Sequence, residues 1–253
     1  MSDSHGNALE DYPEEFNIYN FSAPSDSYFD MERKLNFLIE KNAIDTLILT
    51  VDNHTLSPYR ESLNNLDRSK FYLTRSGYDT TLDYYVDKLY GFLIISEPKI
   101  GLLIQEYMAQ ELKTIFNKPK FSQNNLNKTW KDIGVKERAY RINRRFESQF
   151  GFKNSSQKLQ RSLERMIGLC KANNIVLIGI KFPLTASYYR LIKNKDMGAA
   201  KILETSGFKV MDFSKTYFAK ETLFENEDHL NSQGGDVFTR LLHSNLRQLS
   251  TLN

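Results

Sequence analysis

Three apolar runs along the chain alternate with segments whose apolar residues recur every three to four positions. The runs Asp45–Val51, Asn174–Ile180 and Phe208–Phe213 are almost continuous in Val, Ile, Leu and Phe. Such runs are typical of parallel strands with helices on both faces of the sheet. Phe16–Phe21 predicts a fourth, weaker strand. The pattern predicts a doubly wound, mostly parallel α/β sheet.

Helical periodicity fills the intervals between these strands. Apolar residues at spacings of three and four predict helices over Ser27–Lys41, Leu159–Cys170, Ala186–Ser206 and Ser232–Leu249. The alternation of strand and helix supports the same α/β class.

The alternation stops within residues 57–154, which are polar, rich in aromatic residues and helical in pattern. A structureless loop of that length is improbable inside a compact domain. We therefore predict three parts. Residues 1–56 and 155–253 form the two halves of the α/β domain, and residues 57–154 form an inserted helical cap.

Composition narrows the class of protein. The 253 residues are 40% hydrophobic and 26% charged, as in ordinary globular domains. A net charge of +3 is too small to predict a nucleic-acid partner. The single cysteine, Cys170, cannot form an intramolecular disulfide. Neither a signal peptide nor a membrane-spanning segment is visible, so the chain as given is predicted to be cytoplasmic.

One segment, residues 128–145, concentrates positive charge around three aromatic residues. The basic residues are Lys128, Lys131, Lys136, Arg138, Arg141, Arg144 and Arg145, and the aromatic ones are Trp130, Tyr140 and Phe146. One interpretation is a solvated helix face. The other is a contact surface for an anionic substrate, a phosphate-bearing carrier or a membrane.

The first residues allow two chemistries. Asp3 and His5 fit the D-x-H start of a metallophosphoesterase, whereas Ser4 between them fits the nucleophile of an esterase. A two-metal phosphoesterase needs further ligands from several strand ends. The chain has four histidines and none of the later metal motifs of that family, so the sequence predicts neither a metal nor an organic cofactor.

The opposite end of the chain supplies a base for the serine. His229 precedes the helix predicted at Ser232–Leu249, and Ser232 is a suitable N-cap. A loop at that place faces the carboxyl ends of the strands, where active sites of open α/β sheets lie. Ser4 and His229 are therefore the candidate nucleophile and base.

Two motifs together resemble the SGNH, or GDSL-type, hydrolase superfamily. Ser2-Asp3-Ser4-His5 resembles its first block, with Ser2 replacing Gly, and Asp228-His229-Leu230-Asn231 with Gly234 resembles its last. The likeness is greatest to the branch that acylates or deacylates bacterial cell-surface polysaccharides. It implies a flavodoxin-like fold and covers most of the chain except the cap.

The resemblance also implies an oxyanion hole and an orienting acid. Ser25 stands near the position of the second-block glycine, and Asn53 is the side-chain donor candidate, although a strict strand alignment selects His54. The family's acid usually stands three residues before the histidine, where this chain has Asn226. The orienting group therefore stays open between Asn226, Glu227 and Asp228, or is absent in a Ser-His dyad.

A second departure concerns the first strand. Only Met1, Ser2 and Asp3 precede Ser4, whereas the fold implies a buried strand there. The first strand is therefore predicted to be truncated, and missing upstream sequence could add an anchor and a cell-envelope location.

The expected function is a serine esterase or O-acyltransferase that acts on an acyl ester of a carbohydrate through Ser4 and His229. Two alternatives differ in class. One is a catalytically degenerate binding or scaffold protein of the same fold, favoured by Asn226 and the short N-terminus. The other is the metallophosphoesterase.

Overall fold

Three parallel strands form the centre of the protein, which a computed structural model describes at residues 1–9, 16, 18–92 and 129–250. The strands β1 (Thr46–Thr50), β2 (Val176–Lys181) and β3 (Lys209–Asp212) lie in the order β1-β2-β3. Their positions agree with the three apolar runs to within one or two residues. The α/β class is therefore confirmed. The weaker strand predicted at Phe16–Phe21 is wrong, because residues 18–21 form no strand.

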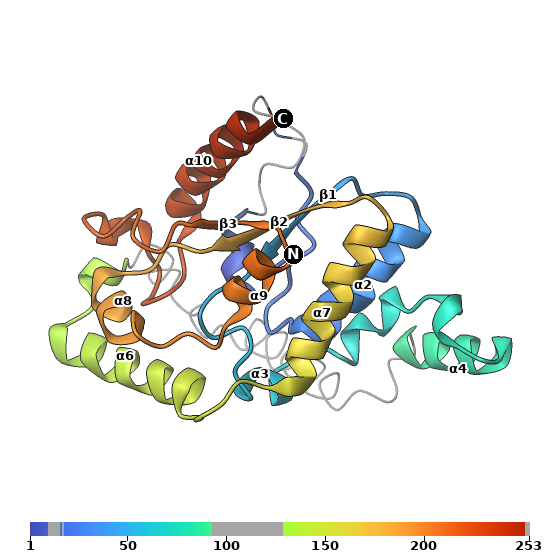
Figure 1. Ribbon diagram of the computed structural model, residues 1–253. Coiled ribbons are helices and arrows are strands. Elements are labelled where there is room, and N and C mark those ends of the chain that lie inside the picture. The colour runs from blue at the N-terminus through green and yellow to red at the C-terminus, as the bar shows by residue number, and fades with distance from the viewer. Residues whose placement is uncertain (10–15, 17, 93–128, 251–253) are drawn as a thin grey trace, which may run out of the picture.

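Helices follow and separate the strands (Figure 1). The α-helices are α2 (Tyr28–Glu40), α3 (Tyr59–Ser62), α4 (Thr81–Phe92), α6 (Val135–Phe150), α7 (Gln157–Ala172), α8 (Ala186–Ile192), α9 (Ala199–Thr205) and α10 (Ser232–Ser250). Short 3₁₀ helices are η1 (Ser4–Leu9), η2 (Arg68–Tyr72), η3 (Arg75–Gly77), η6 (Trp130–Asp132) and η7 (Glu221–Leu223).

The helix predicted over Ala186–Ser206 is wrong as a single element, because the chain forms α8 and α9 with a break between them. Gly198 sits at the N-cap of α9 with a φ of 97°, a left-handed conformation that favours glycine and cannot continue a helix. The Asp196 carboxylate accepts the Gly198 N–H at 2.7 Å, which fixes this turn.

Two hydrophobic clusters pack against the sheet, and alternate residues of β1 contribute to each. Leu47, Leu49 and Val51 pack with α2, α7 and α9, whereas Ile48 packs against the cluster that includes residues of α6, α8 and α10. Figure 1 shows α2 beside α7, with α10 at the other side of the sheet. Because helices cover both faces of the sheet, successive strand residues are buried on alternate faces, and the strands are continuous apolar runs in the sequence.

The first residue lies along the free edge of β1. The Met1 amino group donates to the Ile48 carbonyl at 2.6 Å, and the Thr50 N–H donates to the Met1 carbonyl at 3.1 Å. This is the bonding pattern of a short parallel pairing. It places η1, which starts at Ser4, beside the carboxyl end of β1.

A substitution of Gly179 in β2 tests how tightly side chains pack against the sheet. A Cβ added there would lie 2.7 Å from Leu203 Cδ2 and 3.0 Å from Val210 Cγ2. Gly179→Ala is expected to lower the free energy of unfolding by about 1–3 kcal/mol, because the core is already filled. Gly168→Ala, on the exposed face of α7 with open space around it, should instead raise it by about 0.5–1 kcal/mol. Urea unfolding of the two variants measures both, and equal effects would contradict the packing.

Candidate active site

The two ends of the chain meet at one hydrogen bond. The Oγ of Ser4 lies 2.7 Å from Nε2 of His229, although 225 positions separate them. Ser4 begins η1, and His229 lies in a loop closed by an antiparallel bridge between Phe224 and Leu230. Both side chains are partly buried, so the pair lies near the surface of the protein.

A carboxylate contacts the other nitrogen of the same ring. Asp228 Oδ1 lies 2.7 Å from Nδ1 of His229, and the Asp228 side chain is 1% exposed. With the ring proton on Nδ1, His229 donates to Asp228 and its Nε2 is free to accept the Ser4 hydroxyl proton. The contacts therefore run in series from Ser4 through His229 to Asp228.

Asn226, three residues before His229, holds the loop through its side-chain oxygen. Its Oδ1 accepts the backbone N–H groups of Asp228 at 3.1 Å and His229 at 2.9 Å. It also lies 3.0 Å from Nδ1 of His229, farther than the Asp228 oxygen. Of the three residues left open by the sequence, Asp228 makes the shortest contact with the ring.

Arg145 of α6 fixes Asp228 from the other side. Its Nε and Nη2 donate to the two Asp228 oxygens at 2.8 and 2.9 Å, a bidentate ion pair. Burial on its own would raise the pKa of Asp228, but His229 and Arg145 hold that pKa well below its ordinary value of 3.8. Asp228 is therefore an anion at neutral pH.

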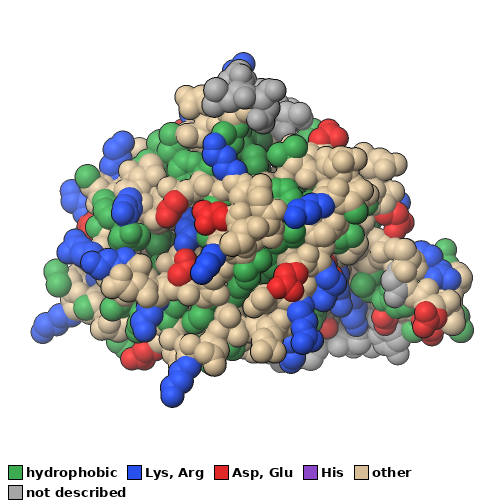
Figure 2. Space-filling view, viewed as in Figure 1, with side chains coloured by type: hydrophobic (Ala, Val, Ile, Leu, Met, Phe, Trp, Pro, Cys, Tyr) green, Lys and Arg blue, Asp and Glu red, His purple; other side chains and the backbone are tan. Residues whose placement is uncertain are grey.

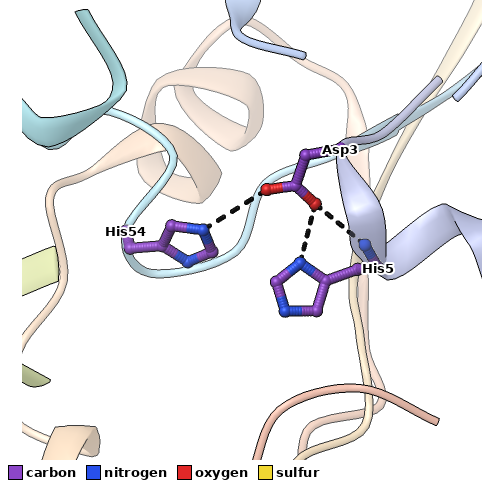
Figure 3. Close-up of side chains that lie close together, drawn as sticks. All are labelled: Asp3, His5 and His54. Carbon is purple, nitrogen blue, oxygen red and sulfur yellow. Dashed lines mark hydrogen bonds and ion pairs between the residues drawn. The ribbon is translucent and has the colours of Figure 1, made fainter. Parts of the chain in front are cut away.

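Asp3 contacts both His5 and His54 (Figure 3), and the His5 ring in turn lies against the ring of His229. Asp3 Oδ1 lies 2.7 Å from Nδ1 of His5 and also accepts the His5 backbone N–H at 3.1 Å. Its Oδ2 lies 3.5 Å from Nε2 of His54 and 3.3 Å from Nη2 of Arg60. Burial opposes the ionised form of Asp3, yet His5 and Arg60 hold its pKa well below 3.8.

Two groups of side chains bring three potential metal donors together: Asp3 with His5 and His54, and His5 with Asp228 and His229. In each group the shortest contact, at 2.7 Å, is a hydrogen bond between a histidine nitrogen and a carboxylate oxygen. A metal ion bound by both atoms would have to break this hydrogen bond. The Arg60 guanidinium already places a positive charge beside Asp3. The arrangement fits a hydrogen-bonded network better than a cation site.

The two oxyanion candidates have different surroundings. Ser25 has a φ of 71°, a left-handed conformation that favours glycine, the residue that the resemblance implies near that position. The Asn53 amide donates to the Lys195 carbonyl at 2.8 Å and accepts from Lys181 Nζ at 2.7 Å. Neither residue has a contact with Ser4 among those described, and their oxyanion role stays a prediction.

The segment that contacts η1 directly comes just before Ser25. The Asn20 amide donates to the Gly6 carbonyl at 2.8 Å. A Cβ on Gly6 would lie 2.2 Å from Ser22 Oγ, so only glycine permits this approach. Asn20 and Ser22 belong to the stretch 20–25, which resembles the family's second block, but that resemblance pointed to Ser25 and not to these two side chains.

The basic segment 128–145 is divided between the core and the surface. Trp130 is fully buried, Arg138 pairs with Glu221 at 2.9 Å and Arg145 with Asp228, whereas Lys131, Lys136, Arg141 and Arg144 are exposed. Lys128 lies outside the described residues. Figure 2 shows Lys and Arg side chains on the surface over α6. A contact with an anionic substrate or a membrane stays a prediction.

Comparisons with known proteins add no family assignment. Neither a scan against protein-family models nor a search of curated proteins found a match to this chain. Among the described residues, the helices are too short or too polar to cross a bilayer.

The buried carboxylates predict a dependence of stability on pH. Because the folded-state pKa values of Asp3 and Asp228 lie below the ordinary 3.8, their stabilisation is present above about pH 4 and is lost as pH falls through the folded values. The free energy of unfolding should therefore decrease as the pH falls from about 5 to about 2. Asp3→Asn and Asp228→Asn should each flatten that decrease in urea titrations. Curves parallel to the wild type would contradict the assignment.

Proposed function

We propose that this protein is a serine esterase or O-acyltransferase with an SGNH-like fold, acting on an acyl ester of a carbohydrate. The observation that carries the proposal is the contact of Ser4 Oγ with His229 Nε2 at 2.7 Å, with Asp228 on the opposite ring nitrogen. A nucleophile needs a base within hydrogen-bonding distance, and the base needs a group that orients it. All three are present in one site.

The reaction follows from these contacts. Ser4 Oγ attacks the acyl carbonyl carbon while His229 Nε2 takes the hydroxyl proton. The tetrahedral intermediate then collapses: the ester C–O bond breaks, and the leaving alcohol takes the proton from His229. The acyl group is left on Ser4. Water or a sugar hydroxyl then attacks the acyl carbon of this acyl-enzyme while His229 accepts its proton. The bond between the acyl carbon and Ser4 Oγ breaks, Ser4 Oγ takes the proton from His229, and the acid or the new ester leaves.

The charge that develops on the carbonyl oxygen needs donors. We assign this role to the backbone N–H groups near Ser4 and Ser25, and the left-handed backbone at Ser25 supports a specialised turn there. One N–H of the Asn53 amide already donates to the Lys195 carbonyl, and its oxygen accepts from Lys181, so only the second N–H could donate to the oxyanion.

The SGNH-like fold is supported by the order of the site residues in the chain and by the sheet. Ser4 follows the Met1 segment that pairs with β1, the base lies in the loop before α10, and the described strands are parallel. A catalytically degenerate scaffold is less favoured, because Asp228 supplies the carboxylate that Asn226 lacks.

A fluorophosphonate probe tests the nucleophile. The wild-type protein should be labelled covalently on Ser4, and Ser4→Ala should lose labelling and reduce hydrolysis of p-nitrophenyl acetate by at least about 10³-fold, because no other group replaces the attacking oxygen. Ser76→Ala removes an exposed serine of η3 and should retain both. Labelling that persists in Ser4→Ala, or activity abolished by a chelator, would reject the serine mechanism.

A further inference from the structure

His5 takes no part in the mechanism above, yet its ring lies against the base. The rings of His5 and His229 are stacked, with centroids 4.5 Å apart and planes inclined by 6°. Nε2 of His5 lies 3.6 Å from Asp228 Oδ2, and Nδ1 lies 2.7 Å from Asp3 Oδ1. The same Asp228 that orients His229 is therefore also approached by the ring stacked on His229.

Both nitrogens of His5 face carboxylates, and this decides its protonation. A neutral imidazole has one N–H and can donate to one carboxylate, whereas the imidazolium can donate to both. Burial opposes the charge, but the carboxylates of Asp3 and Asp228 raise the pKa of His5 well above its ordinary 6.5.

Charged and titratable groups approach His5 from four parts of the chain. They are Asp3 in the N-terminal segment, Asp52 and His54 after β1, Arg60 of α3 beyond Asp3, and Asp228 and His229 before α10. Asp52 Oδ2 is 3.8 Å from Nδ1 of His5 and already accepts the Thr50 hydroxyl. Arg60 contacts Asp3, and Arg145 contacts both Asp228 and Glu227. A positive His5 therefore adds a third cation to a site that holds several carboxyl groups.

We propose that His5 is a positioning residue, a buried imidazolium that holds Asp228 in place and faces the ring of the base with a positive charge. The effect of His5 on catalysis, described next, rests on the proposed function of Ser4 and His229. When His229 takes the Ser4 proton, its ring becomes a second cation beside the first. Like charges in contact disfavour that state, so His229 returns the proton readily to the leaving alcohol.

The pH dependence of kcat/KM tests the charge. His5→Gln keeps a donor of similar reach but no charge, and the acid limb of the profile should move to higher pH by about one unit. His5→Phe keeps the stacked ring without donor or charge and should also lower kcat, roughly tenfold or more, because Asp228 loses a partner. His243→Gln, in α10 against Phe16, should match the wild type. An unshifted acid limb in a folded His5→Gln protein would overturn the proposal.

A measurement that needs no turnover separates this proposal from the proposed function. In ¹⁵N-histidine-labelled wild-type protein at pH 7, the His5 ring, assigned by its absence in His5→Gln, should show both nitrogens protonated, and His229 should carry its proton on Nδ1. A neutral His5, or a His229 Nδ1–H signal unchanged in His5→Gln, overturns the positioning role. If these signals are as expected but no acyl ester is turned over, the proposed function fails and the ion network stands.

Discussion

Two carboxylates buried directly behind the Ser4–His229 pair impose the main constraint on this structure. Asp3 and Asp228 are 3% and 2% exposed, and a buried carboxylate is tolerated only where cations and donors surround it. His5 and Arg60 surround Asp3, whereas Arg145, His229 and His5 surround Asp228. Neutralising the two anions thus joins the N-terminal segment, α3, α6 and the loop before α10. Loss of one cation would leave a buried anion with fewer partners.

The segment that interrupts the α/β alternation supplies part of the site. α6 lies within residues 57–154, and its Arg145 makes the bidentate pair with Asp228. Gln149 of the same helix donates from Nε2 to Asp228 Oδ2 at 3.4 Å, and its Oε1 accepts a hydrogen bond from the Tyr188 hydroxyl at 2.5 Å. Residues of α6 also belong to the cluster that packs on the sheet. The helix α6 therefore contributes side chains that contact the buried Asp228, in addition to packing over the sheet.

The predictability of the fold follows from the range of each interaction. The three strands and the helices α2, α7 and α10 could be located from the sequence, because burial on both faces or on one face leaves a local period. The separation of α8 from α9 depends on one glycine turn within an otherwise helical pattern. In the site, Ser4 and His229 stand out through their flanking motifs. Arg145 does not, because in sequence it is one of several basic residues and its partner lies 83 positions away.

The orienting acid shows most clearly why local sequence was insufficient. A residue next to a histidine in the chain reaches the neighbouring ring poorly unless its side chain is turned by other contacts. Here Asn226 accepts both backbone N–H groups of Asp228 and His229, which tightens the loop and turns the Asp228 carboxylate toward Nδ1. Arg145 then fixes both oxygens. The amide at the usual acid position shapes the backbone, and the carboxylate two residues later carries the charge. In the family that the sequence resembles the acid stands at the position of Asn226, whereas here the carboxylate closest to the ring belongs to Asp228.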